Sequence, residues 1–316
     1  MPDRPALSIV IPCYNSAATI GALVTELATL DIDGGHEVIL VNDGSRDDTA
    51  RICAELVRTA PVPVTFVDLA RNFGEHNAVM AGLRFARGAY VINIDDDGQN
   101  PPAQVEKLYR HARASGCDVV YTYYAEKHHA RWRNWGSWLT NRVADVLLEK
   151  PRGLYLSSFR CMSALVVEQI CRYDGPYPYV DGLIFQVTQN VGRMQVEHEP
   201  RRSGRSTYTM QKLANLWLNM FLNFSIVPLR VSSVLGLLFS VVGFLATVPV
   251  IIEALVRDTP PGWGSFMCAL LVFAGVQLLT IGLVGEYVGR MYLTTNRRPQ
   301  FVIREVAQSD GQRTGA

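Results

Sequence analysis

The amino-terminal part of the chain alternates between short apolar strands and stretches with helical apolar spacing, and this order limits the possible folds more than any other feature. Strands are predicted at Leu7–Ile11, Glu37–Val41, Val64–Val67 and Ala89–Ile94. Repeated strand-helix-strand units require a parallel sheet that is covered by helices on both faces. Ligands of such sheets bind beyond the carboxyl ends of the strands. The sequence therefore predicts a doubly wound α/β fold with its site at that edge.

Three adjacent aspartates follow the strand predicted at Ala89–Ile94. Side chains alternate across a strand, so Asp95 and Asp97 are expected to point one way while Asp96 points away. Two convergent carboxylates repel each other unless a cation lies between them, and Mg²⁺ favours one or two carboxylates completed by water and substrate phosphates. The run predicts a cation that holds a diphosphate at the tip of the sheet. A solvated acidic turn is the alternative that the run alone leaves open.

Motif content and composition exclude several other classes of function. No GxGxxG or GxxxxGK[ST] loop follows any predicted strand, so dinucleotide-binding and P-loop proteins have no support. The net charge of +1 argues against nucleic-acid binding spread over the protein, and no nucleic-acid partner is expected. The 6 cysteines are scattered without a CxxC pair, which is typical of reduced thiols facing a cytosol and not of a zinc site or a disulfide framework.

Two long uncharged segments, Val231–Ile252 and Thr259–Gly285, dominate the carboxyl-terminal part. Each exceeds the roughly 20 apolar residues that cross a bilayer, so a transmembrane hairpin over 230–290 is predicted, with buried helices of a soluble protein as the alternative. Arginines flank the hairpin at its two ends, whereas the connecting loop carries only Arg257. By the positive-inside rule, the amino-terminal part and the tail over 291–316 face the cytoplasm. The polar residues beyond Val306 are expected to be disordered.

Two further stretches predict contact with the membrane surface. From Met210 to Phe224, apolar residues crowd one side of a helical pattern, which predicts an interfacial amphipathic helix within 210–229. Between Ala130 and Leu148, a helical pattern is rich in tryptophan and arginine. That composition suits either a membrane-facing helix or an aromatic helix on the protein surface.

Several motifs occur in collinear order over nearly the whole chain. They read SIVIPCYN at 8–15, VNDGS at 41–45, LARNFG at 69–74, DDDGQNPP at 95–102, SFR at 158–160, RRSGRSTY at 201–208 and GLVGEYVGR at 282–290. Each motif alone is weak evidence, but their order together with two predicted spans resembles glycosyltransferase family 2. The resemblance is greatest to its polyprenyl-phosphate branch, which transfers sugars such as glucose, aminoarabinose or mannose to a lipid phosphate.

This resemblance implies a fold and an activity. The implied fold is a GT-A nucleotide-sugar-binding (Rossmann-like) domain over 1–209, an interfacial helix over 210–229, two transmembrane helices over 230–290 and a cytoplasmic tail over 291–316. The implied activity is inverting transfer of a sugar from a nucleotide-diphospho-sugar, expected to be a UDP-sugar, to polyprenyl (undecaprenyl) phosphate in the inner membrane. Mg²⁺ or Mn²⁺ is the implied cofactor, and a homo-oligomer is the implied assembly.

The resemblance also implies roles for residues at matching positions. The metal is assigned to Asp95, Asp97 and Gln99. The donor nucleotide is assigned to Pro12, Tyr14, Asn15, Asp43 and Asp95. The catalytic residues are Asp97 and Arg201, of which Arg201 is expected to face the phosphates. The acceptor phosphate is assigned to Arg131, Arg133, Arg205 and Ser206.

The chain departs from the family pattern in two places. Thr207 stands where a lysine is common, and Arg205 is expected to supply the missing charge. Ser157 and Ser158 replace a Gly-Asp pair, so no acidic role is carried over to that position. The role of Arg160 stays open between a structural ion pair and a functional contact.

The implied chemistry requires no catalytic base. The acceptor is a phosphate monoester with a second pKa of about 6, so it reaches the site already charged at neutral pH. His76 is therefore interpreted as a structural histidine, with a role as base as the alternative. A processive polysaccharide synthase would carry a Gln-x-x-Arg-Trp motif, yet His128 stands three residues before Arg131. A non-catalytic scaffold of a membrane glycan complex is disfavoured because the aspartates are intact.

Overall fold

The computed structural model describes residues 4–124, 154–197, 262–296 and 298–309, together with the isolated positions 234, 236, 238, 241 and 245. These residues belong to two units of the chain. One unit consists of Met1–Asn215 and Arg297–Ala316, and the other is Leu216–Asn296. The predicted α/β domain falls in the first unit.

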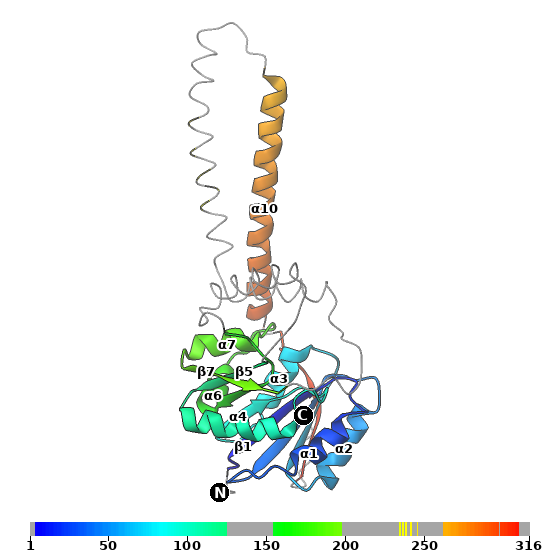
Figure 1. The fold of residues 1–316 in the computed structure, drawn as a ribbon. Helices are drawn as coiled ribbons and strands as arrows, with labels where there is room; N and C mark the ends of the chain where they lie inside the picture. Colours follow the sequence, from blue (N-terminus) through cyan, green and yellow to red (C-terminus); the bar gives the residue numbers. More distant parts are fainter. Residues whose placement is uncertain are drawn as a thin grey trace. The chain divides into compact units, whose positions relative to one another are not determined.

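The first unit is built on one eight-stranded sheet in the order β7-β5-β6-β4-β1-β2-β3-β8 (Figure 1). The strands β1 to β4 are parallel neighbours, as predicted. By contrast, β6 runs antiparallel to β4 and β5, and β8 runs antiparallel to β3. The bounds are β1 (Leu7–Cys13), β2 (His36–Asn42), β3 (Val64–Leu69), β4 (Tyr90–Asn93), β5 (Val119–Tyr124), β6 (Arg160–Ser163), β7 (Val191–Val196) and β8 (Ile303–Gln308).

Helices pack on both faces of this sheet. They are α1 (Ile20–Leu27), α2 (Thr49–Thr59), α3 (Glu75–Leu83), α4 (Pro102–Ser115), α6 (Ala164–Ile170) and α7 (Val180–Val187). The helix α1 contacts α2 and α4, whereas α7 contacts α3 and α6, so the helices form two layers around the buried strands β1 and β2. The closest approach is at Gly82 of α3, where a Cβ would lie 2.5 Å from Val10 Cγ1. Only glycine allows α3 to pack this closely on the sheet.

The order of the strands reverses at β1, which lies between β2 and β4. In an open α/β sheet, the ligand crevice forms at the carboxyl ends of the strands where this reversal occurs. The loops that follow β1, β2 and β4 therefore start at the same edge. This topology brings together three of the motifs found in the sequence, at 12–15, 42–45 and 95–97.

The edge strand β8 comes from the segment that follows the second unit in the chain. Val306 of β8 pairs with Val67 of β3 and is buried. The expectation of disorder beyond Val306 is wrong for Ala307 and Gln308, which pair with β3 as well. A part of the segment predicted as a tail over 291–316 is thus a strand of the first unit's sheet.

The main described element of the second unit is the helix α10 (Trp263–Thr295), which is 33 residues long. It covers most of the uncharged segment Thr259–Gly285. Among the residues that the structure describes, no helix combines the length and the hydropathy required to cross a membrane. The interfacial helix over 210–229 and most of Val231–Ile252 lie outside the described residues. The two transmembrane helices therefore stay a prediction.

Candidate active site at the carboxyl edge of the sheet

The three aspartates lie in a turn, because β4 ends at Asn93 before the first of them. Asp95 Oδ2 accepts a hydrogen bond from Ser158 Oγ at 2.5 Å. Burial raises the pKa of Asp95 to about 7, and the negative charges of Glu75, Asp97 and Asp96 act in the same direction. The described carboxylates around Asp95 therefore concentrate negative charge at the position predicted for the metal.

Asp97 folds this turn with its own side chain. Its Oδ1 accepts from the Gln99 backbone N–H at 3.0 Å, and Gly98 between them adopts a positive φ of 71°. This arrangement is an Asx turn, which a glycine in the left-handed region completes. Within the described ranges, no group of three or more His, Cys, Asp or Glu side chains is arranged to hold a metal ion. The predicted set of Asp95, Asp97 and Gln99 contains two carboxylates.

Asp96 has different hydrogen-bond partners from Asp95 and contacts the loop that follows β1. Its Oδ2 accepts from Tyr14 N at 3.0 Å and also from the Ser16 hydroxyl. Burial raises the pKa of Asp96, while these hydrogen bonds oppose the rise. The alternation rule behind the predicted direction of this side chain holds only within a strand, and β4 ends three residues earlier. Asp96 thus ties the carboxylate turn to the loop that follows β1.

The end of β1 and the loop after it carry three of the residues predicted to bind the nucleotide. Pro12 lies within β1, the Tyr14 side chain is exposed, and Asn15 has a positive φ of 54°. Asparagine tolerates this left-handed conformation better than most residues. Asn15 N donates to Ser45 Oγ at 3.0 Å, and Asn15 Oδ1 accepts from Arg46 N at 2.9 Å. The loops after β1 and β2 are therefore held together.

Asp43 is buried at the end of β2 and holds the loop over 71–74. Its Oδ1 accepts from Phe73 N at 2.7 Å, and its Oδ2 accepts from Gly74 N at 2.9 Å. Burial raises the pKa of Asp43, and these two N–H donors partly offset the effect. The next residue, Gly44, has a φ of 63°, and a Cβ there would lie 2.5 Å from the Arg71 carbonyl carbon. The predicted role of Asp43 beside the nucleotide stays a prediction, but its role in shaping that loop is clear.

Two residues with open roles have structural partners. Arg160 and Asp181 are both buried and form an ion pair, and Tyr121 Oη donates to Asp181 Oδ1 at 2.8 Å. This is the structural interpretation of Arg160. His76 packs edge-to-face against the Tyr179 ring with centroids 5.0 Å apart, and burial is the main cause that lowers its pKa. A neutral, ring-packed His76 agrees with the interpretation as a structural histidine.

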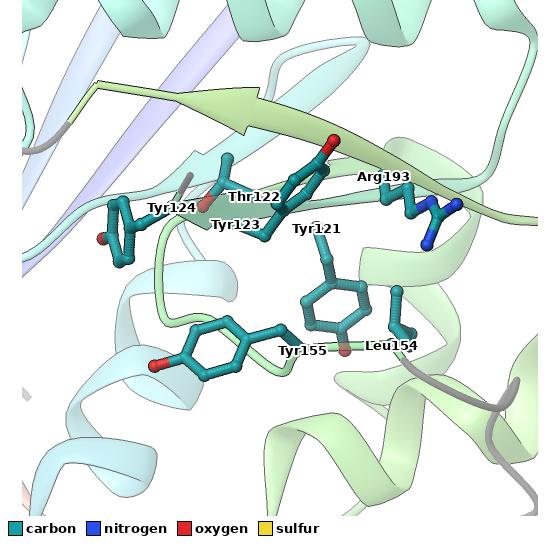
Figure 2. A pocket seen from close by; sticks show the side chains of 7 residues that line it. All are labelled: Tyr121, Thr122, Tyr123, Tyr124, Leu154, Tyr155 and Arg193. Atoms are coloured by element: carbon teal, nitrogen blue, oxygen red, sulfur yellow. The ribbon is translucent and has the colours of Figure 1, made fainter. Parts of the chain in front are cut away.

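An aromatic pocket adjoins the carboxylate turn and was not predicted. Its volume is about 250 Å³, and Figure 2 shows the Tyr124 and Tyr155 side chains on one side of it. Tyr124 Oη donates to Asn100 Oδ1 at 3.1 Å, three residues after Asp97. The pocket is lined by Tyr121, Thr122, Tyr123, Tyr124, Leu154, Tyr155 and Arg193.

The remaining predicted site residues lie outside the described residues. They are Arg131, Arg133, Arg201, Arg205 and Ser206. Of the site predicted from the sequence, the structure therefore brings together the donor loops and the carboxylate turn. It also adds Asp96, Ser158 and the aromatic pocket. In the sequence, Ser158 stands out only as a serine in place of the second residue of the family's Gly-Asp pair.

Comparison with known proteins gives matches over both parts of the chain. Residues 8–164 match glycosyl transferase family 2, and residues 227–291 match the GtrB C-terminal hairpin. The undecaprenyl-phosphate 4-deoxy-4-formamido-L-arabinose transferase of Pseudomonas savastanoi pv. phaseolicola is 33% identical, with 97% of this chain and 92% of that protein covered. The protein of the same name from Aeromonas hydrophila subsp. hydrophila is 30% identical, with 97% of this chain and 95% of that protein covered.

Among solved structures, the glucosyl-3-phosphoglycerate synthase of Mycobacterium tuberculosis in complex with Mn²⁺ and UDP is similar with a TM-score of 0.49. The identity is 18%, and the match covers 68% of this chain and 76% of that chain. This level of similarity is too low to support an inference about ligands. The full-length similarity to the two transferases, in contrast, is decisive for the family. The chain belongs to glycosyl transferase family 2.

Proposed function

We propose that the protein transfers a sugar from a nucleotide-diphospho-sugar to undecaprenyl phosphate, with inversion at the anomeric carbon. The observation that carries this proposal is the 33% identity over 97% of the chain to an undecaprenyl-phosphate transferase. The similarity covers the α/β domain and the carboxyl-terminal hairpin alike, so donor and acceptor functions are expected to be shared. The carboxylate turn and the loops after β1 and β2 supply a site of the matching kind.

Mg²⁺ or Mn²⁺ is the proposed cofactor, held by Asp95, Asp97 and the Gln99 side chain. Oxygen ligands of this type and number suit either ion when substrate phosphates and water complete the coordination. The negative charges of Glu75, Asp97 and Asp96, which help to raise the pKa of Asp95, support the proposal, because a cation would relieve that repulsion. When bound, the ion would stabilise the negative charge that develops on the departing nucleoside diphosphate. Arg201 is proposed to face the same phosphates.

The residues of the chain would do the rest by positioning. The loop held by Asp96, which carries Tyr14 and Asn15, and the loop held by Asp43 would bind the nucleotide at the carboxyl ends of β1 and β2. The acceptor phosphate is proposed to bind to the predicted set Arg131, Arg133, Arg205 and Ser206. As a phosphate dianion it attacks the anomeric carbon directly, and in-line attack inverts that centre.

The aromatic pocket is the proposed site of the transferred sugar. Tyr124 of the pocket contacts Asn100, and Thr122 contacts Ser157 at 3.1 Å. The next residue, Ser158, donates to Asp95. Aromatic faces pack against the apolar faces of sugar rings, and the tyrosine hydroxyls supply hydrogen bonds. The identity of the sugar and of the nucleotide would be decided here and in the loops after β1 and β2.

A membrane location is part of the proposal. An undecaprenyl phosphate stays in the bilayer, so its transferase has to work at the headgroup plane. The uncharged segments Val231–Ile252 and Thr259–Gly285, and the match of 227–291 to the GtrB C-terminal hairpin, support two transmembrane helices. Exposed apolar side chains along α10 include Phe266, Leu270, Phe273, Leu278 and Ile281. The proposed location is the inner membrane, with the α/β domain facing the cytoplasm, and a homo-oligomer stays a prediction.

The test is mass spectrometry of the lipid product. The full chain in detergent is incubated with Mg²⁺ or Mn²⁺, undecaprenyl phosphate and a panel of UDP-, GDP- and dTDP-sugars. The proposal predicts one donor that adds a single sugar to the lipid phosphate. A product with many sugar units would favour the polysaccharide synthase, and no transfer from any donor would favour the non-catalytic scaffold.

A further inference from the structure

The carboxyl-terminal strand β8 contacts the nucleotide side of the sheet through one arginine. Arg304 Nη1 lies 3.2 Å from Asp68 Oδ2, and Arg304 Nη2 donates to Ala70 O at 2.8 Å. Ala70 N in turn donates to Val302 O at 2.9 Å. Both backbone groups of Ala70, the first residue after β3, are therefore held by the β8 segment.

Asp68 connects this contact to the end of β2. Its carboxylate is buried, and its Oδ1 accepts from Asn42 Nδ2 at 2.7 Å. Asn42 is also buried, and its Oδ1 accepts from Ser45 N at 3.2 Å. A carboxylate can only accept and a backbone N–H can only donate, so the Asn42 amide has one orientation that satisfies both. The three groups form a fixed connection from Arg304 to the loop after β2.

Both connections end at residues predicted to bind the nucleotide. Ser45 Oγ accepts from Asn15 N at 3.0 Å, which links Asn42 to the loop after β1. Ala70 leads directly into the loop over 71–74, whose Phe73 and Gly74 N–H groups hold the Asp43 carboxylate. The β8 segment therefore supports both loops that flank the proposed donor site.

We propose that Arg304 is a positioning residue for the donor nucleotide, and that it acts through Asp68 and Asn42 and through the backbone of Ala70. This inference rests on the proposed function and deepens it, because it makes the residues after the hairpin part of the donor site. The Arg304 side chain is 62% exposed, and an exposed ion pair by itself contributes little. Its effect has to come from holding the buried Asp68 and the Ala70 carbonyl in place.

The test measures nucleotide binding to the full chain in detergent by isothermal titration calorimetry. UDP, GDP and dTDP are each titrated in the presence of Mn²⁺. Arg304→Gln is expected to weaken binding of the preferred nucleotide about five- to tenfold, and Arg304→Lys by less, because lysine keeps the charge beside Asp68. Glu305→Gln, at an exposed neighbour on the same strand, is the matched control and should bind as the wild type does. In turnover assays, KM for the donor should rise while KM for the lipid acceptor stays unchanged.

Asp68→Asn separates positioning from a general loss of folding. Asparagine can still accept from Asn42 but no longer carries the charge that Arg304 faces. Because Arg304 acts partly through Asp68, the double variant should bind the nucleotide more tightly than the product of the two single losses predicts. Thermal midpoints identify any variant that fails to fold, and Arg304→Lys then carries the comparison.

Two results would overturn the inference. One is wild-type affinity in Arg304→Gln, and the other is a double variant in which the two single losses multiply in full. An equal rise of KM for donor and acceptor would also contradict a role at the donor site. A wild-type protein that binds none of the three nucleotides would refute the proposed function itself, and the inference with it.

Discussion

Two carboxylates at opposite ends of the same sheet, the buried Glu37 and the half-buried Asp95, have opposite surroundings. Glu37 lies near the amino end of β2, where Arg87 Nη2 and Nε approach its Oε2 at 2.6 Å and 2.9 Å. The Ser8 hydroxyl donates to Oε1 at 2.7 Å. The negative charge of Glu37 is thus compensated within the protein, which is what burial of a charge requires.

Asp95 lies beyond the carboxyl end of β4 and has a neutral donor, the Ser158 hydroxyl. Its neighbours Glu75, Asp97 and Asp96 carry the same charge and help burial to raise its pKa to about 7. Among the described residues, an arginine compensates Glu37, which serves the fold, whereas further carboxylates surround Asp95. Such local violations of good packing are expected at functional sites.

The largest effect is expected for a substitution in the carboxylate turn at the candidate site. Asp97→Ala should lower kcat/KM about a thousandfold, because a metal ligand stabilises charge in the transition state. The thermal midpoint should fall only slightly, since the variant loses one hydrogen bond in a turn outside β4. The measurement is lipid product formed per unit time at saturating Mg²⁺ or Mn²⁺. Activity close to that of the wild type would remove Asp97 from the metal site.

The second largest effect is expected at the pair between Arg87 and Glu37 near the amino end of β2. Arg87→Gln should lower the free energy of unfolding by about 1.5–3 kcal/mol, because two charge-assisted hydrogen bonds to the buried Glu37 are lost. Nucleotide affinity should stay as it is. Thermal or denaturant unfolding of the full chain in detergent measures the change. Arg51→Gln, which breaks an exposed pair with Asp48, is the control and should leave the free energy of unfolding nearly unchanged. Equal losses of unfolding free energy in the two variants would contradict a special role for the charge compensation of Glu37.

The third prediction concerns Asp96, which is hydrogen-bonded within the fold as Glu37 is but lies at the candidate site. Asp96→Ala should weaken nucleotide binding about tenfold, because the Tyr14 N–H and the Ser16 hydroxyl lose their acceptor. Asp96→Asn keeps an acceptor oxygen and should bind nearly as the wild type. Calorimetric titration distinguishes the two variants. If the alanine variant binds normally, Asp96 serves the fold only.

The smallest effect concerns pH and the amino end of β2. Burial lowers the pKa of His36, whose Nε2 lies 3.0 Å from Leu27 O. A lowered pKa means that the unfolded chain takes up the proton first, so stability is full above about pH 6.5 and falls as the pH drops below it. His36→Gln should flatten this part of the pH dependence of the thermal midpoint. His111→Gln, at an exposed residue of α4, is the control and should leave the slope intact. An unchanged slope in His36→Gln would contradict the assignment.

The centre of the fold was predictable because its signals are local. Apolar runs at 7–11, 37–41, 64–67 and 89–94 correspond to β1 to β4, and the polar residues after them mark the edge that carries the site. The strand predicted at 89–94 is one residue longer at each end than β4 (Tyr90–Asn93). The apolar residue Ile94 lies after the end of β4, so the alternation rule was applied to aspartates that stand in a turn.

The strand β8 could not be predicted from local pattern. Its partner β3 lies more than two hundred residues away in the sequence, and its residues alternate too weakly to mark a strand. The aromatic pocket could not be predicted for a similar reason, because the residues at 121–124 and Tyr155 come together only after the chain has folded. Roles that depend on residues distant in sequence, such as those of Ser158 and Arg304, become visible only in the structure.

Electron paramagnetic resonance of Mn²⁺ bound to the full chain tests the central claim most directly. The claim is that the carboxylate turn holds a divalent cation in contact with the donor diphosphate. With the preferred nucleoside diphosphate present, the wild type should show tight Mn²⁺ binding with hyperfine coupling to phosphorus, and Asp97→Ala should lose both. Phosphorus coupling that persists unchanged in Asp97→Ala, or Mn²⁺ that binds without contact to the diphosphate, would contradict the account.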